Sequence, residues 1–317
     1  MSELQDAAMR AIRDCLAVKK GETVLVITDV EKRSIGYALW EAAKEVGAEA
    51  MLTEIVPRRT HGEEPPPALA EFMKQVDVII APTSKSITHT KARRIACEAG
   101  ARVATLPNIT VSMMRRAVRA DYDRIAEASI KAADFLTRGA TARLTTPAGT
   151  NIIMSLVGAR GMADTGQFRK PGQFGNLPSG EAYIAPVENS AHGVIVVDGS
   201  MAGIGMLSGP IRLTVRSGYV TKISGGRGAQ ELRKLIQPFG RLGRNIAELG
   251  LGTNYKAKLT GNILEDEKVA GTAHIALGDN ASIGGTVSVP SHLDGLLLQP
   301  TLEIDGQKIM EDGKLLI

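Results

Sequence analysis

The feature that most constrains the fold is an alternation of short apolar runs with amphipathic segments in the first half of the chain. Continuous apolar strands separated by helical patterns are typical of a parallel sheet that helices cover on both faces. We therefore expect an open parallel α/β sheet domain over residues 1–139. The four runs that predict its strands are ETVLVIT (22–28), AEAMLTEIV (48–56), DVIIAPT (77–83) and ARVATLP (101–107).

Near Gly139 the pattern changes to short β-prone runs that are separated by glycines. Runs such as GVIVVDG (193–199) and TLEIDGQ (301–307) are typical of antiparallel strands joined by tight turns. We therefore predict a second, mostly antiparallel β-rich domain over residues 140–317. A length of 317 residues also suits two domains better than one core.

Composition narrows the class of protein. With 44% hydrophobic and 23% charged residues the chain reads as globular, and it lacks an apolar stretch long enough to span a bilayer. The N-terminal MSELQDAAMR lacks the features of a signal peptide, so we expect a cytoplasmic protein without membrane contact. A net charge of only +4 and 3% aromatic residues argue against a nucleic-acid partner. The turn after the first strand, TDVEKRSIG, has no glycine-rich phosphate-binding fingerprint.

Side chains that can bind metal are concentrated in four segments of the second half. In VPSHLDG, His292 and Asp294 lie two residues apart, so on an extended strand both point to the same side. His274 lies in GTAHIALG, Glu181 follows a Pro-Ser-Gly turn, and Glu248 lies in the neutral run IAELGLG. Imidazole beside carboxylate suits zinc, manganese, cobalt or iron(II). Taken singly, such a histidine is more often a hydrogen-bonded core residue than a ligand, and such a glutamate is more often a solvated surface charge.

Taken together and in order, these segments resemble the aminopeptidase T type of metalloaminopeptidase. The resemblance is carried by NLPSGEAYIAP, AELGLGTN, DEK followed by HIALGDN, and SHLD. It implies that the β-rich domain carries two divalent metal ions. The ligands that it implies are Glu181, Glu248, His274, His292 and Asp294. The chain departs from that family in a shorter connection between His274 and His292, in Lys268 where the peptidases have asparagine, and in Ala281 where they have tyrosine.

The resemblance implies a metal-dependent aminopeptidase, that is, a protease-type hydrolase that removes N-terminal residues from peptides. Two ions of zinc, cobalt, manganese or magnesium activate a water, and Glu267 is the candidate general base. The resemblance also implies a homodimer that acts on a small peptide or another small molecule.

Two alternatives remain. The chain also resembles the 2,5-dihydroxypyridine 5,6-dioxygenases, which look to have the same fold and carry the Pro-Ser-Gly turn and the His-Leu-Asp segment. This second resemblance implies one iron(II) and a hydroxypyridine-type substrate. A metal-stabilised binding protein without turnover is the third possibility. Because all five residue types are present, we predict two metals and hydrolysis.

Overall fold

The computed structural model describes residues 2–317, and the expected parallel sheet is present in it. Its strands are hydrogen-bonded in the order β2-β1-β3-β4-β8, and every pair is parallel. Apolar side chains of the inner strands, such as Leu25 and Ile79, are fully buried, as a sheet covered on both faces requires. The strands are β1 (Thr23–Asp29), β2 (Glu49–Ile55), β3 (Val78–Ala81), β4 (Arg102–Thr105) and β8 (Phe174–Asn176).

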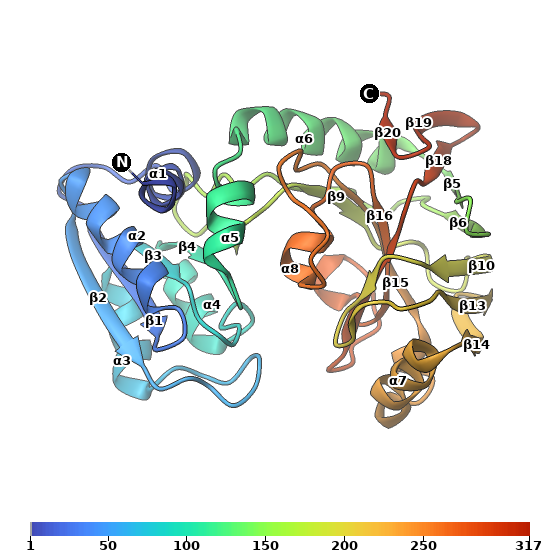
Figure 1. The fold of residues 1–317 in the computed structure, drawn as a ribbon, viewed down its shortest axis with the longest axis horizontal. Coiled ribbons are helices and arrows are strands. Elements are labelled where there is room, and N and C mark those ends of the chain that lie inside the picture. Colours follow the sequence, from blue (N-terminus) through green and yellow to red (C-terminus); the bar gives the residue numbers. More distant parts are fainter. Residues whose placement is uncertain (1) are drawn as a thin grey trace. The chain divides into compact units, whose positions relative to one another are not determined.

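Helices join these strands, as the alternating pattern predicts (Figure 1, blue to cyan). They are α1 (Glu3–Arg10), α2 (Arg33–Glu45), α3 (Pro67–Phe72), α4 (Lys91–Glu98) and α5 (Val111–Met113). A π-helical turn follows α1 at Ala11–Cys15 and another follows α5 at Met114–Val118. The predicted α/β fold class is therefore confirmed for this part of the chain.

The chain divides into two compact units, and each unit is made of two separate stretches of the sequence. Unit 1 contains residues up to 123 and residues 166–179, and unit 2 contains residues 124–165 and 180–317. The predicted boundary after Gly139 differs because most of helix α6 (Tyr122–Arg138) packs Ala132 and Leu136 into the core of unit 2. The segment 166–179 returns to unit 1 and supplies β8, a pairing that no local pattern predicts.

Unit 2 contains two antiparallel sheets, which confirms the predicted β-rich second half. The eight-stranded sheet has the order β14-β13-β10-β6-β5-β18-β19-β20. Its strands are β5 (Thr141–Thr145), β6 (Asn151–Ser155), β10 (His192–Val197), β13 (Ile211–Arg216), β14 (Tyr219–Gly225), β18 (Thr301–Ile304), β19 (Gln307–Glu311) and β20 (Lys314–Leu315).

The seven-stranded sheet of unit 2 has the order β12-β11-β17-β16-β15-β9-β7. Its strands are β7 (Met162–Asp164), β9 (Glu181–Ile184), β11 (Ser200–Met201), β12 (Gly205–Met206), β15 (Ile246–Gly252), β16 (Ala273–Gly278) and β17 (His292–Leu297). One apolar core joins both sheets. Leu144 and Leu213 of the eight-stranded sheet lie in the same buried cluster as Leu249 and Ile275 of the seven-stranded sheet. Burial of such side chains is the main stabilising contribution to this unit.

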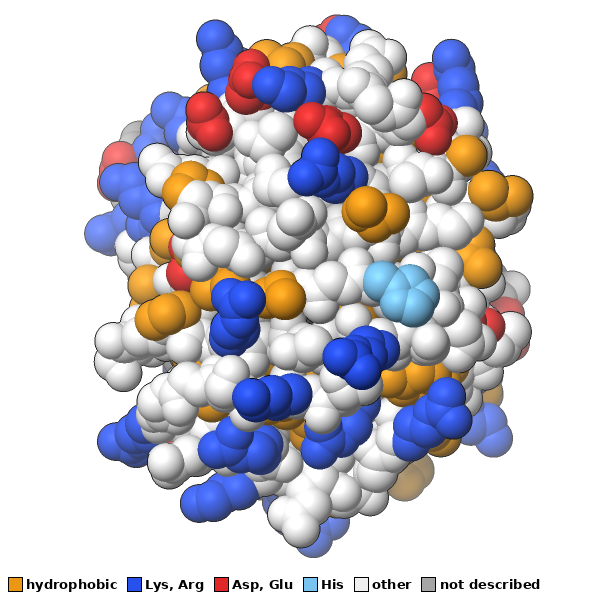
Figure 2. Space-filling view, turned by 90° about the vertical axis from the view of Figure 1, so that its right-hand side faces the viewer, with side chains coloured by type: hydrophobic (Ala, Val, Ile, Leu, Met, Phe, Trp, Pro, Cys, Tyr) orange, Lys and Arg blue, Asp and Glu red, His pale blue; other side chains and the backbone are white. Residues whose placement is uncertain are grey.

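Two short helices complete unit 2, α7 (Arg227–Ile236) and α8 (Ile263–Asp266). Figure 2 shows one face of the molecule, on which basic side chains gather in the lower part, at the level of α7. The exposed basic residues of α7 are Arg227, Arg233 and Lys234. Among the described helices, none is both long enough and apolar enough to cross a bilayer.

Candidate metal centre

The five predicted ligands come together on one face of four neighbouring strands. Along β15, β16 and β17, the pairs Gly250–His274, Glu248–Ala276, Ala276–Asp294 and Gly278–His292 lie directly opposite each other. Glu181 at the start of β9 lies opposite Gly252 of β15. Directly opposed residues project to the same side of a sheet, and so do residues two apart on one strand. All five side chains therefore share one face.

The opposite face of these strands explains why the ligands point outward. Leu249 and Leu251 of β15 alternate with the ligand positions, as do Ile275 and Leu277 of β16, and all four are buried in the apolar core of unit 2. A shift of either strand by one residue would exchange the apolar set for the polar set. The hydrophobic pattern thus fixes the side to which His274 and Glu248 point.

Glu248 lies at the middle of the cluster. Its Oε1 is 3.1 Å from Nε2 of His274, and its Oε2 is 3.4 Å from Nε2 of His292. Nε2 of His274 is also 3.4 Å from Oε2 of Glu181, and Nε2 of His292 is 3.5 Å from Oδ1 of Asp294. Two groups with convergent ligand atoms result, Glu181–Glu248–His274 and Glu248–His292–Asp294, and they share Glu248.

Glycines of β15 make room for this arrangement. A Cβ atom at Gly250 would lie 1.9 Å from Nε2 of His274, so only glycine lets the imidazole lie across that strand. A Cβ atom at Gly252 would lie 2.0 Å from the carbonyl oxygen of Val269. Gly252 therefore lets the chain that carries Glu267 and Lys268 approach the cluster. The motif ELGLG supplies one ligand and two such spaces.

His292 is held in the orientation that a metal ligand needs. Its Nδ1 lies 2.8 Å from the carbonyl oxygen of Asp279, which can only accept, so this nitrogen carries the proton. In the neutral ring, Nε2 then presents its lone pair to Glu248 and Asp294. A backbone carbonyl behind the far nitrogen is the usual partner of a metal-binding histidine. The side chain of His292 is 34% exposed, whereas that of His274 is fully buried.

A buried lysine forms the other side of the cluster. Nζ of Lys268 donates to Oε1 of Glu181 at 2.5 Å and to Oε1 of Glu267 at 2.6 Å. It also lies 3.7 Å from Oδ2 of Asp164, and its side chain is only 2% exposed. The carboxylates and the ammonium each favour the charged form of the other. Burial lowers the pKa of Lys268, but Glu181, Glu267 and Asp164 together raise that pKa well above its usual range.

The charge balance of the cluster fits a bound cation. Burial lowers the pKa of His274, but Glu248 and Glu181 outweigh it and raise that pKa to about 9. Burial raises the pKa of Glu181 to about 8, although the Lys268 ammonium opposes this. For Glu248, burial raises the pKa, yet His274 and His292 lower it overall. The carboxyl groups of Asp164, Glu181, Glu248, Glu267 and Asp294 stand against one ammonium and two imidazoles, so a bound cation would balance negative charge in the cluster.

The unpaired atoms lead to the same conclusion. Within the described residues 2–317, Oε2 of Glu181 and Nδ1 of His274 are buried without a hydrogen-bond partner. Because Nε2 of His274 faces Glu181 and Glu248, Nδ1 of that ring points out of the cluster. Oε2 of Glu181 is thus the buried acceptor within the cluster that a cation would satisfy. The donor set of three carboxylates and two imidazoles therefore fits a divalent cation, and it does not by itself select the metal.

The structure thus brings all six predicted site residues into one cluster. Glu267, predicted as the general base, is there as an ion-pair partner of Lys268, and its role in catalysis stays a prediction. Sequence reasoning missed Asp164, which stands opposite Glu181 at the end of β7. No local motif marks Asp164, because only the pairing of β7 with β9 brings it to the site. The motif DEK marks Lys268 as a departure from the peptidases, but no local pattern predicts that its side chain is buried.

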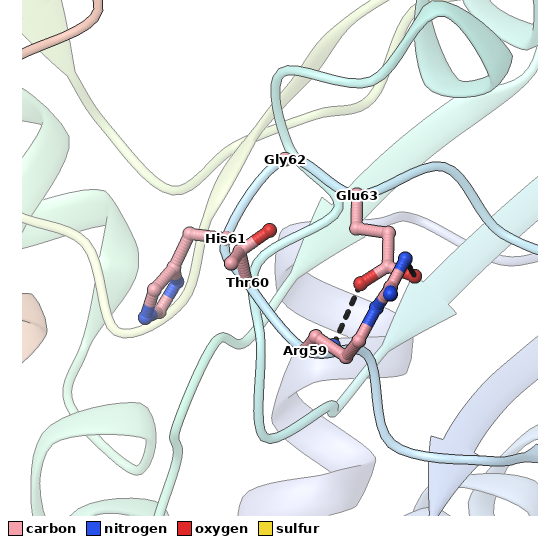
Figure 3. A pocket seen from close by; sticks show the side chains of 5 residues that line it. All are labelled: Arg59, Thr60, His61, Gly62 and Glu63. Atoms are coloured by element: carbon pink, nitrogen blue, oxygen red, sulfur yellow. Dashed lines mark hydrogen bonds and ion pairs between the residues drawn. The ribbon is translucent and has the colours of Figure 1, made fainter.

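The described part of unit 1 has an open pocket of about 440 Å³ in the loop after β2 (Figure 3). It is lined by Arg59, Thr60, His61, Gly62 and Glu63. Glu63 accepts a hydrogen bond from the backbone N–H of Arg59, while the His61 ring points away from this pair. Nδ1 of His61 accepts from the backbone N–H of Ser86, so the residues lining this pocket have no convergent ligand set.

The fold and the cluster define a two-unit α/β protein with a site suited to a divalent metal. A family model described as 2,5-dihydroxypyridine 5,6-dioxygenase matches residues 3–317, and the chain belongs to that family. A curated 2,5-dihydroxypyridine 5,6-dioxygenase of Pseudomonas putida is 26% identical over 170 residues. The match covers 48% of this chain and 47% of the relative, so the chain spans about half the length of the curated relative that it matches.

Two solved structures share the fold over nearly the whole chain. The 2,5-dihydroxypyridine dioxygenase from Pseudomonas putida KT2440 has a TM-score of 0.84 and 19% identity, with 100% of this chain and 98% of that chain covered. Wild-type AmpT from Thermus thermophilus has a TM-score of 0.74 and 19% identity, with 99% of each chain covered. At such identity, each likeness shows the fold alone.

The prediction of an aminopeptidase, and with it of a hydrolase or protease, is wrong. The family match over residues 3–317 and the curated relative both point to the dioxygenases, and the aminopeptidase is a neighbour in fold only. The error has a physical source. Carboxylates and imidazoles on one sheet face serve one metal ion as well as two, so their order along the chain indicates the fold and a metal site without indicating the reaction.

Proposed function

We propose that this protein is a ring-cleaving dioxygenase that uses one iron(II) and acts on a hydroxypyridine-type substrate. The observation that carries the proposal is the membership of residues 3–317 in the 2,5-dihydroxypyridine 5,6-dioxygenase family. The side-chain chemistry is compatible with it, because imidazole and carboxylate are ligands that suit iron(II).

His292 and Asp294 are the proposed core of the iron site, with Glu248 between them and His274. The carbonyl of Asp279 holds the His292 ring, and the β16–β17 pairing holds Asp294 beside it. When bound, iron(II) supplies the one-electron chemistry that dioxygen needs in order to react with an aromatic ring. The partial exposure of His292 leaves one side of the ligand set accessible to a substrate.

Proton transfer is the proposed task of Glu267. A hydroxypyridine must lose a hydroxyl proton to bind as an anion, and a nearby carboxylate is a suitable acceptor. Glu267 is 15% exposed, and the Lys268 ammonium fixes one of its oxygens at 2.6 Å. The same ammonium compensates the negative charge that gathers when an anionic substrate approaches.

Oxygen uptake tests this proposal directly. The protein is purified without oxygen, loaded with iron(II) and mixed with 2,5-dihydroxypyridine, while an oxygen electrode and the ultraviolet absorbance of the ring follow the reaction. We expect one dioxygen consumed per ring lost. His292→Ala should abolish uptake, whereas His192→Ala should not, because His192 is an exposed histidine of unit 2 outside the cluster.

The result that would reject the proposal is an iron-loaded protein, with iron content measured in the same sample, that consumes no oxygen with 2,5-dihydroxypyridine or related hydroxypyridines. Equal activity of the His292→Ala and His192→Ala variants would reject the assigned site. The reaction would then have to take place at another site of the protein.

A further inference from the structure

We propose that the ammonium group of Lys268 takes the place of a second metal ion and is the feature that limits this centre to the single ion of the proposed function. The inference rests on the metal centre of the proposed function and is independent of ring cleavage. It starts from the two ligand groups that share Glu248, Glu181–Glu248–His274 and Glu248–His292–Asp294. In each group, one ligand atom per residue lies within 4.8 Å of the others, an arrangement that by composition alone would suit two ions.

Lys268 breaks the equivalence of the two groups. Its Nζ is bonded to Glu181 at 2.5 Å and to Glu267 at 2.6 Å, so Glu181 already serves a cation. Within the described part of the chain, Asp294 has no ammonium or guanidinium partner, and its ion-pair contact is with the His292 ring at 3.5 Å. An ion on Glu181 would be separated from the ammonium by a single carboxylate. Like charges at that separation in a buried site repel strongly, which lowers affinity by a factor on the order of 100 or more.

The backbone of Lys268 is held on both sides, so its ammonium could move only by rotation of the buried side chain. The N–H of Lys268 donates to the carbonyl of Glu265 at 3.0 Å, and its own carbonyl accepts from the N–H of Asn254 at 2.8 Å. The close approach of this segment to Gly252 leaves no space for it to shift toward β15. With 2% of its side chain exposed, Lys268 also has no short route to solvent.

The single ion is therefore assigned to Glu248, His292 and Asp294. This group contains the imidazole whose tautomer is set by the carbonyl of Asp279. Glu181, with one oxygen on Lys268, becomes a positioning residue that keeps the ammonium beside the metal centre. Lys268 in turn determines the number of ions that the site accepts.

Counting bound metal tests the proposal without any reference to oxygen uptake. Full-length protein is freed of metal, dialysed against Mn²⁺ and analysed for manganese per chain, and electron paramagnetic resonance reports whether ions are coupled in pairs. We expect one uncoupled Mn²⁺ in the wild type. Lys268→Ala removes the charge and opens space, so we expect a second ion, a coupled spectrum, and a gain in second-site affinity on the order of 100-fold. Lys258→Ala, at an exposed lysine of the same unit, should keep one ion.

Each outcome decides the question. Two ions in the wild type, or one ion in folded Lys268→Ala, would overturn the proposal. If circular dichroism shows that Lys268→Ala does not fold, Glu181→Gln decides instead: one Mn²⁺ at near wild-type affinity agrees with the assignment, and loss of that ion contradicts it. A protein that binds one ion but consumes no oxygen would reject the proposed reaction and leave the role of Lys268 intact.

Discussion

Substitution of Gly250 by alanine adds one methyl group at the point where the site is most tightly packed. The new Cβ atom would lie 1.9 Å from Nε2 of His274, about half a van der Waals contact distance, so the imidazole must move. Overpacking of a well-packed interior costs about 1–3 kcal/mol. Loss of the 3.1 Å hydrogen bond between His274 and the Glu248 carboxylate adds about 1.5–3 kcal/mol. We therefore expect the free energy of unfolding of unit 2 to fall by roughly 2.5–6 kcal/mol.

The assay must report on unit 2. The only tryptophan, Trp40, belongs to unit 1, so tryptophan fluorescence follows that unit during urea unfolding. Far-ultraviolet circular dichroism follows both units, and the part of its transition that fluorescence does not follow reports on unit 2. Gly209→Ala is the matched control, because Gly209 lies in unit 2 with open space where the methyl group would go. If Gly250→Ala unfolds within about 0.5 kcal/mol of the control, a change typical of ordinary surface positions, the argument that glycine is needed beneath His274 fails.

Three further predictions concern the metal. Asp294→Asn should lower Mn²⁺ affinity at least tenfold with little change in circular dichroism, and unchanged affinity in equilibrium dialysis would remove Asp294 from the site. Metal at about 100 times its dissociation constant should stabilise unit 2 by about 2.7 kcal/mol, so a chelator should lower its calorimetric transition; an unmoved transition contradicts this. The pKa of His274 is raised from 6.5 to about 9, so protonation stabilises the metal-free fold fully below pH 6.5, and this contribution is lost as pH rises through 9. Metal affinity should rise over that window with proton release, measured by titration calorimetry in buffers of different ionisation enthalpy.

The reaction class illustrates where motif reasoning stops. Glu181, Glu248 and His274 are all present, and the complete set of five residue types favours a two-metal hydrolase. The structure shows that one of these predicted ligands, Glu181, accepts a hydrogen bond from a buried ammonium. A lysine in a sequence reads as a solvated charge by default. The burial of Lys268 depends on its close approach to Gly252 and on the turn after α8, and both belong to the tertiary structure.

Local periodicity was sufficient for much of the fold. The apolar runs at 22–28, 48–56, 77–83 and 101–107 became β1, β2, β3 and β4 within a few residues, because continuous burial requires continuous apolar sequence. The His-x-Asp spacing at His292 and Asp294 placed both side chains on one face of β17 for a similarly local reason. The return of residues 166–179 to unit 1 had no such signal.

The amino-acid sequence alone therefore specifies the set of strands, the side to which each predicted ligand points, and the residue types available for metal. Strand periodicity and apolar alternation act over a few residues and can be read from them. The tertiary structure alone decided which strands are neighbours, and so which charges meet. Glu181 and Lys268 are 87 positions apart in the chain and 2.5 Å apart in space. Coulomb interactions depend on that distance in space, and the number of positive charges already in place sets how many metal ions the carboxylates can hold.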